Sequence, residues 1–326
     1  MSRTIIIIFS LILIQLETSA QDPFFSQFYN SILLLNPAYA GAAHHPRVAA
    51  AYRNQIPAMG SPYVTYNAAY DMPVRVLQGG IGINIMNDVQ GATINRTSID
   101  AIYSYFLAVT PDLVINAGFQ ASYCHRFLKT SDMILPDGLD ATGIYIGHTE
   151  PIADMNRGYP DFAVGFVMYN RIAYGGVSMS HLTRPNTSYS KTYHQPLPRK
   201  LTVHAGVFLS IYERRLGREA LKLNPNLVYL HQGGFRQANY GLDVIYLNLL
   251  AGIWFRHSPD FDLNAFSVHL GYEHDFFRIG YSYDFNVMDP WRTMRNMGAH
   301  EVTFLLKLEY KKGQRANFKA IKCPKN

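Results

Sequence analysis

Histidine is the side chain most often used for acid–base chemistry near neutral pH, so the 12 histidines of this 326-residue chain are examined first. Their spacing does not assemble a site. His44 and His45 are adjacent at the start of an expected strand, where neighbouring side chains point to opposite faces. His204, His269 and His300 are scattered along the chain. HExxH, GxSxG, P-loop and CxxC motifs are absent from the sequence. We therefore predict a non-enzymatic protein without catalytic residues, metal ligands or a cofactor.

The first 20 residues have the pattern of a secretory signal peptide. Arg3 supplies a positive start, and Ile5 to Leu16 is apolar except for two residues. The stretch ends in small residues up to Ala20, as a cleavage site requires. We expect residues 1–20 to be removed, an exported mature chain to begin near Gln21, and nucleic acid to be no partner.

The composition of the chain favours a β protein. It is 48% hydrophobic, 13% aromatic and 16% charged, with a net charge of +6. Beyond the signal, no apolar run reaches the roughly 18 residues of a membrane helix. An exported chain of this kind is either a large soluble β protein or a membrane β-barrel. Cys124 and Cys323 are expected near opposite membrane faces, so we do not predict a disulfide between them.

Alternating residues favour the barrel. Ile81, Ile83 and Ile85 alternate with Gly82 and Asn84, and similar segments recur at about the length that a tilted membrane strand needs. Their polar faces carry Gly, Ser, Asn and both signs of charge, as a lumen does. The fold class is therefore all-β, a transmembrane antiparallel β-barrel of about 14 strands in the outer membrane, with counts of 12 or 16 left open. Strands are expected to start near Pro46, Pro62, Gly79, Arg96, Asp112, Pro160, Ile172, Arg199, Ala220, Phe235, Asn248, Asp262, Phe276 and Gly298.

Loop lengths alternate along the chain, which orients the barrel. Tight turns such as Thr110–Asp112 are opposed by long connections such as Lys129–Tyr159 and Leu182–Lys200. Short periplasmic turns opposite long outer loops are the rule for such barrels, which puts both termini in the periplasm. Charged side chains predicted to face the lumen could pair with one another, or serve selectivity or docking: Asp100, Arg278, Asp284, Glu301 and Lys307.

The stretch Phe24–Gly41, FFSQFYNSILLLNPAYAG, is too short to span a bilayer as a helix and too apolar for a free linker. Asn36-Pro37 punctuates it, and Gly41 frees the chain to turn. It could simply pack wherever the fold offers an apolar opening. The sharper hypothesis is a plug at or in the periplasmic mouth. The expected domains are residues 1–20 as signal peptide, 21–45 as plug-like segment, 46–311 as barrel and 312–326 as basic tail.

Several motifs resemble the PorP/SprF family of type IX secretion membrane proteins. They are LNPAYAG at Leu35–Gly41, AYRNQ at Ala51–Gln55, GGIGINIMNDVQG at Gly79–Gly91 and AIKCP at Ala320–Pro324. Where the family usually has a tryptophan after RNQ, this chain has Ile56-Pro57. The resemblance marks as candidate plug and motif residues Asn36, Pro37, Tyr39, Gly41, Arg53, Asn54 and Gln55.

The resemblance implies an outer-membrane component of the type IX protein secretion and gliding motility machinery of Bacteroidota. It would support export or surface anchoring of substrates with C-terminal sorting domains. The implied partners are outer-membrane lipid, periplasmic and peptidoglycan-linked secretion proteins, and the secreted substrates themselves. The alternative is an outer-membrane porin or small-molecule transporter.

Basic residues gather at the end of the last strand and in the tail. The tail is either a solvated end resting on lipid headgroups or a docking surface for an acidic periplasmic partner. The docking hypothesis concerns Lys311, Lys312, Arg315, Lys319 and Lys322, flanked by Lys307 and Lys325.

Overall fold

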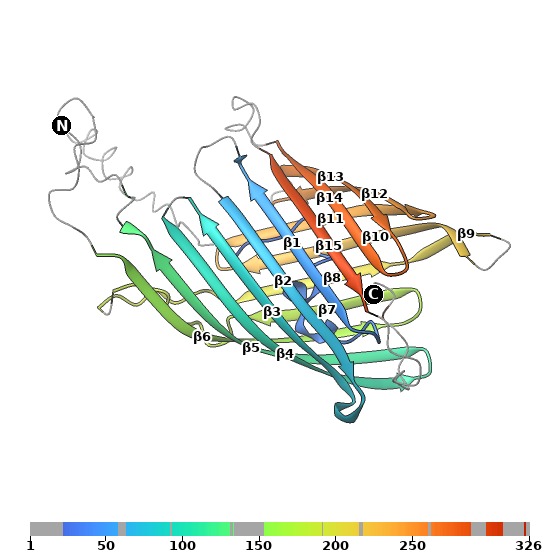
Figure 1. The fold of residues 1–326 in the computed structure, drawn as a ribbon, viewed down its shortest axis with the longest axis horizontal. Helices are drawn as coiled ribbons and strands as arrows, with labels where there is room; N and C mark the ends of the chain where they lie inside the picture. The colour runs from blue at the N-terminus through green and yellow to red at the C-terminus, as the bar shows by residue number, and fades with distance from the viewer. Residues whose placement is uncertain are drawn as a thin grey trace, which may run out of the picture.

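The strands of the computed structural model form one antiparallel sheet that closes into a barrel (Figure 1). The structure describes residues 22–57, 63–91, 93–130, 133, 153–190, 192–214, 218–259, 262–287, 298–308 and 323. Neighbouring strands pair in chain order, except that β8 and β9 both pair with β10, and β1 also pairs with β15. Because the sheet closes in this way, the backbone groups that lipid cannot satisfy are paired within it. Among the described strands, β9 has a partner on one side only.

The first seven strands are β1 (Arg47–Gln55), β2 (Tyr63–Val74), β3 (Gly79–Gln90), β4 (Ile94–Thr110), β5 (Leu113–Leu128), β6 (Met155–Tyr169) and β7 (Ala173–Ser180). The remaining strands are β8 (Lys200–Val207), β9 (Leu209–Arg214), β10 (Arg218–Gln232), β11 (Phe235–Tyr246), β12 (Leu249–His257), β13 (Leu263–Glu273), β14 (Phe277–Asn286) and β15 (Ala299–Lys307). In the described part of the chain, three short helical elements accompany them: α2 (Ile32–Leu35), η1 (Pro37–Tyr39) and η3 (Arg75–Leu77). Within the described residues, no helix has both the length and the apolar character needed to cross a bilayer.

The barrel has 14 strands, because β8 and β9 are one strand with an interruption. Both pair with β10, β8 along Asn226–Gln232 and β9 along Arg218–Leu223. Phe208 lies between them and packs against the buried core of the barrel. The predicted fold class and strand number are therefore confirmed. The strand starts lie within two residues of the predicted positions, except that β6 begins at Met155 and not at Pro160.

Each strand has an apolar outer face and a polar inner face. On β3, Ile81, Ile83 and Ile85 are 39–54% exposed, whereas Asn84 between them is 1% exposed. Similar exposed Leu, Ile, Val, Phe and Tyr side chains recur on the outside around the barrel. Such a surface suits lipid, and the alternation follows from the two-residue repeat of an extended chain.

The two ends of the barrel differ in their connections. We name the short-turn end from its tight links, which include Arg75–Gln78 and the turns after Thr110 and Tyr169. The long-loop end carries the connections between β5 and β6, between β7 and β8 and between β14 and β15. This asymmetry matches the predicted alternation, while the assignment of the short-turn end to the periplasm stays a prediction.

The two cysteines lie at different ends of the barrel. Cys124 is in the half of β5 nearer the long-loop end, and Cys323 donates its backbone N–H to Ala42 near the short-turn end. Both cysteines are buried, and neither is in a disulfide. Their separation agrees with the predicted topology.

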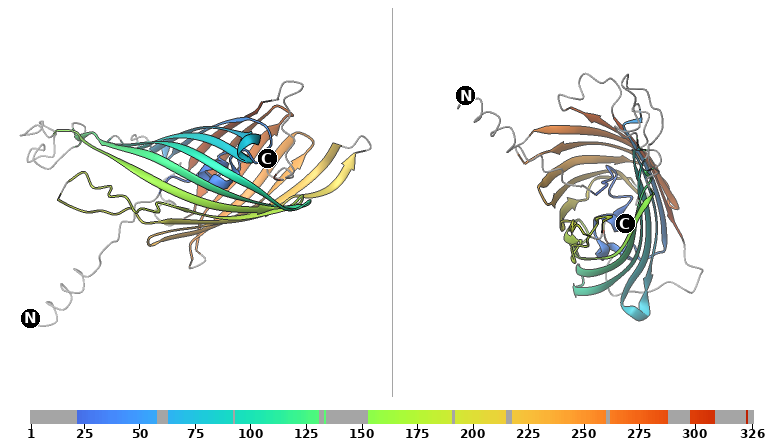
Figure 2. Two further views of the ribbon diagram at one scale, coloured as in Figure 1. Left: turned by 90° about the horizontal axis from the view of Figure 1, so that it is seen from below. Right: turned by 90° about the vertical axis from the view of Figure 1, so that its left-hand side faces the viewer.

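Part of the chain occupies the inside of the barrel. Residues 22–43, here called the lumenal segment, run through the interior before β1 begins (Figure 2). Three wall glycines make room for it, Gly80 and Gly118 for its backbone and Gly165 for the side chain of Asn36. A Cβ atom on Gly80 would collide with Ala40, one on Gly118 with Ala38 and one on Gly165 with Asn36.

A substitution at Gly118 tests whether the barrel wall is built around the lumenal segment. We expect Gly118→Ala to destabilise the folded barrel by about 1–3 kcal/mol, because backbone atoms of the segment must shift to admit the methyl group. Gly175→Ala is the matched control, since the nearest atom to its Cβ would be 3.4 Å away, an ordinary contact. The measurement is the urea midpoint at which heat-modifiable gel migration is lost. Equal midpoints for the two variants would contradict the packing described here.

Candidate functional site

The lumenal segment is the most buried part of the molecule. Gln27, Asn36, Ala38, Tyr39 and Ala40 are each 0% exposed. It starts at Asp22 among residues of the long-loop end and finishes at the short-turn end before β1. The predicted plug therefore does not lie only at one mouth of the barrel, because the segment extends through the lumen.

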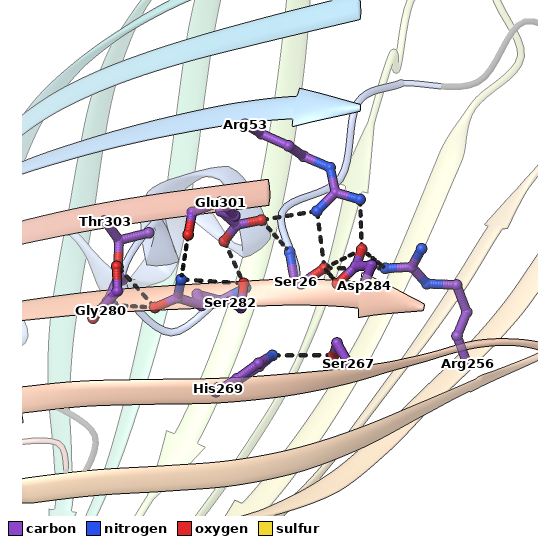
Figure 3. Close-up of polar contacts among 12 residues, drawn as sticks. Ser26, Arg53, Arg256, Ser267, His269, Gly280, Ser282, Asp284, Glu301 and Thr303 are labelled. Carbon is purple, nitrogen blue, oxygen red and sulfur yellow. Dashed lines mark hydrogen bonds and ion pairs between the residues drawn. The ribbon is translucent and has the colours of Figure 1, made fainter. Parts of the chain in front are cut away.

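A charged cluster on the wall holds the beginning of this segment (Figure 3). The carboxylate of Glu301 accepts the backbone N–H groups of Ser26 at 2.7 Å and Gln27 at 2.8 Å. Arg53 forms ion pairs with Glu301 at 3.0 Å and with Asp284 at 2.6 Å. Glu301 is 0% exposed, and a buried carboxylate of this kind is tolerated only when charges and donors compensate it. The wall and the segment therefore stabilise each other.

Ser26 connects the two carboxylates of the cluster. Its hydroxyl lies 2.8 Å from both oxygens of Asp284 and accepts a hydrogen bond from Arg53 at 2.9 Å. Arg256 approaches Asp284 from β12 at 3.4 Å. The mutual pairing of lumenal charges expected from the sequence is present here, and also where Arg278 and Lys307 both contact Glu273.

The Asn-Pro-Ala-Tyr stretch fixes the middle of the segment. The side-chain oxygen of Asn36 accepts the N–H of Ala38 at 2.9 Å, which caps η1, and Pro37 occupies the first helical position. The Asn36 amide donates to the carbonyls of Phe166 and Val177, both at 3.1 Å. One side chain thus shapes the segment and ties it to strands β6 and β7.

Two further motif residues hold the rest of the segment. The hydroxyl of the fully buried Tyr39 lies 3.4 Å from Nδ1 of His204 on β8. Gly41 has a φ of 71°, which favours glycine, and its N–H donates to Asp71 at 2.7 Å. Asp71 is in turn paired with Arg47 at 2.9 Å. Asn36, Tyr39 and Gly41 therefore each have a partner on the wall.

Five of the seven candidate motif residues lie in the lumenal segment or contact it: Asn36, Pro37, Tyr39, Gly41 and Arg53. The other two are at the end of β1, where Asn54 is half-buried and Gln55 is exposed. The candidate docking residues Lys311, Lys312, Arg315, Lys319 and Lys322 are outside the described residues. Among the described residues, no group of three or more His, Cys, Asp or Glu side chains is arranged to hold a metal ion.

Sequence reasoning missed the contacts of Asp22. Its carboxylate lies 2.5 Å from Arg96, 2.6 Å from His181 and 3.7 Å from Lys200. The other nitrogen of His181 contacts Asp161 at 2.5 Å. We call Asp22 and its three cationic partners the Asp22 clasp. These residues are far apart in sequence and share no motif, so no local pattern could reveal the site.

Burial and charge act against each other in this clasp. Burial by itself lowers the pKa of His181, but the carboxylates of Asp22 and Asp161 outweigh it and raise that pKa to about 9. Burial raises the pKa of Asp22, and His181, Arg96 and Lys200 together hold it well below its usual value. At neutral pH the clasp is therefore an ionised cluster.

Removal of Arg53 tests the charged cluster. Arg53→Met leaves Glu301 without a cationic partner, and we expect a loss of about 3–5 kcal/mol in the free energy of unfolding. Arg171→Met is the matched control, because its pair with Asp112 is 74% and 65% exposed and surface pairs contribute about 0–1 kcal/mol. Urea unfolding in detergent gives both values. A loss at Arg53 no larger than at Arg171 would show that the cluster does not stabilise the barrel.

A closed 14-stranded barrel with an apolar outside and a polar lumen is an outer-membrane β-barrel, here with its lumen filled by its own chain. One solved structure supports the fold. The toluene transporter TbuX of Ralstonia pickettii matches with a TM-score of 0.50 and 10% identity over 86% of this chain and 94% of that one. The outer membrane protein Omp33 of Acinetobacter baumannii has a TM-score of 0.46 and 9% identity, covering 82% of this chain and 100% of its own. The toluene transporter TodX of P. putida has a TM-score of 0.49 and 11% identity, covering 86% of this chain and 95% of its own.

The family is defined by sequence. The type IX secretion system membrane protein family PorP/SprF matches residues 17–306, nearly the whole chain. The chain therefore belongs to the PorP/SprF family, as its motifs suggested. No curated protein matches it.

Proposed function

We propose that this barrel is a non-enzymatic component of the type IX secretion machinery that supports export or surface anchoring of substrates with C-terminal sorting domains. Family membership over residues 17–306 is the observation that carries the proposal. Bacteroidota and a role in gliding motility are the setting that this family implies. The filled lumen supports the proposal, because a chain-filled barrel is poorly suited to general diffusion.

A small-molecule transporter is the second candidate. A cavity beside the lumenal segment gives it physical support, because apolar side chains of the segment and polar side chains of the barrel line it together. The toluene transporters share the barrel fold at 10–11% identity, which supports the fold and not the substrate.

A conductance measurement distinguishes a barrel whose lumen is filled from an open porin. We expect the purified protein to show no large steady conductance in planar bilayers, because residues 22–43 fill the lumen. A chain lacking Phe24–Gly41 should conduct if it folds, and heat-modifiable migration checks folding. Gly118→Ala provides a milder change with the whole segment present. A large steady open pore in the intact protein would favour the porin alternative.

A deletion strain tests the secretion role. Loss of the gene should reduce export and surface attachment of sorting-domain proteins, and the intact gene should restore both. A nutrient-uptake defect with normal secretion would overturn the proposal in favour of the transporter. The Arg171→Met variant is a suitable complementation control, because that pair is exposed and makes no contact with the lumenal segment.

We also propose that the basic tail docks on an acidic periplasmic partner. Its charge supports this, and contacts of this kind should weaken as the Debye length falls from about 10 Å at 0.1 M salt to about 3 Å at 1 M. Because Cys323 is buried against Ala42, truncation would disturb the barrel as well as the charge. The sharper variant replaces Lys311, Lys312, Arg315, Lys319 and Lys322 with Gln and keeps Cys323. Unchanged co-purification of periplasmic partners at low salt would refute docking.

A further inference from the structure

The cavity beside the lumenal segment has one apolar and one polar wall. The segment contributes the apolar wall through Phe24, Phe25, Phe28 and Leu33–Leu35. The barrel contributes Ser98, Asp100, Gln120 and Ser122 from β4 and β5, and the Asp22 clasp lies at the same cavity. A space lined in this way matches a small molecule with an apolar body and a charged head.

The clasp is already a carboxylate-binding site. Arg96 and His181 approach the Asp22 carboxylate within hydrogen-bond distance, and Lys200 lies 3.7 Å away. Among the described residues, Asp22 is the one carboxylate within ion-pair distance of Arg96 or Lys200. The other carboxylates nearby have partners of their own, since Asp161 contacts His181 and Asp100 accepts from Asn84 at 2.7 Å. Without Asp22, two buried cations would therefore lack an anion.

Asp22 can be displaced from the clasp without breaking the contacts that hold Ser26, Gln27 and Asn36. Ser26 and Gln27 are held separately by Glu301, and Asn36 by strands β6 and β7. Besides its carboxylate contacts, Asp22 has one backbone hydrogen bond, from its N–H to Gln232 at 3.2 Å. Displacement of Asp22 would thus free the cations, while Phe24 stays stacked on Phe28 and Phe25 stays buried as part of the apolar wall.

We propose that this cavity binds a small amphipathic carboxylic acid, whose carboxylate takes the place of Asp22 among Arg96, His181 and Lys200. The apolar body lies against the phenylalanine and leucine side chains of the lumenal segment. Asp22 acts as an internal competitor that keeps the site closed when the acid is absent. This inference does not rest on the secretion role, because it follows from the cavity and the clasp alone.

The test uses 4-phenylbutanoate as the probe, its neutral amide as the matched ligand, and the full chain purified from outer membranes. A tethered carboxylate competes at an effective concentration on the order of millimolar, so the unmodified protein should bind the acid weakly. Asp22→Asn removes the competing charge with little change of shape. Isothermal titration at low salt should show at least about tenfold tighter binding of the acid to this variant, and no gain for the amide.

Two controls distinguish the site from a general charge effect. Asp112→Asn removes one carboxylate from an exposed turn and should leave the affinity unchanged. Arg96→Gln added to Asp22→Asn should abolish the gain, while heat-modifiable migration reports that the barrel is folded. The proposal is overturned if Asp22→Asn binds the acid no more tightly than the unmodified chain, or if acid and amide bind equally. Normal secretion or its loss has no bearing on this result.

Discussion

A closed β-sheet in lipid encloses an interior that either the chain or water must fill. In this barrel, the buried carboxylate of Glu301 binds the segment that fills it. This carboxylate is fully buried and is neutralised by Arg53, yet its oxygens also take the N–H groups of Ser26 and Gln27. Transfer of an uncompensated carboxylate from water to such an interior is very costly. The wall therefore requires the lumenal segment, just as the segment requires partners for its backbone.

The register of the closing strand pair explains why Arg53 and Glu301 meet. β1 and β15 are at opposite ends of the barrel sequence, and their pairing places Arg53 directly opposite Glu301. Strand parity in the sequence correctly predicted that Glu301 and Asp284 face inward. The pairing with Arg53 could not be predicted, because it depends on closure of the sheet and on a register that no local pattern contains.

Three other features could not be predicted from the sequence, each for a different reason. The apolar alternation from Leu201 to Leu209 reads as one uninterrupted strand, but Phe208 packs towards Tyr174 and separates β8 from β9. The start of β6 was placed too late, because Asn156, Arg157 and Gly158 interrupt the apolar alternation there. The Asp22 clasp depends on side chains from β4, β8 and the loop after β7, which only the closed barrel brings together. Alternation determines which face a residue takes, whereas the contacts across the lumen are determined by the segment that fills it.

The contacts of the lumenal segment differ in how easily they can be released. From Ser26 to Gly41, backbone groups, wall glycines and buried charges interlock, so displacement would expose several partners at once. At Asp22, by contrast, the contacts are those of one carboxylate and one backbone N–H beside a cavity, whereas Phe24 stacks on Phe28 and Phe25 is buried. A change of state that keeps the barrel folded is therefore expected at Asp22, near the long loops. Passage of a polypeptide through the lumen would instead require loss of the Glu301 contacts and of the Asn36 and Gly41 contacts together. The proposed contribution to secretion would therefore be made through the surfaces of the barrel, not through its lumen.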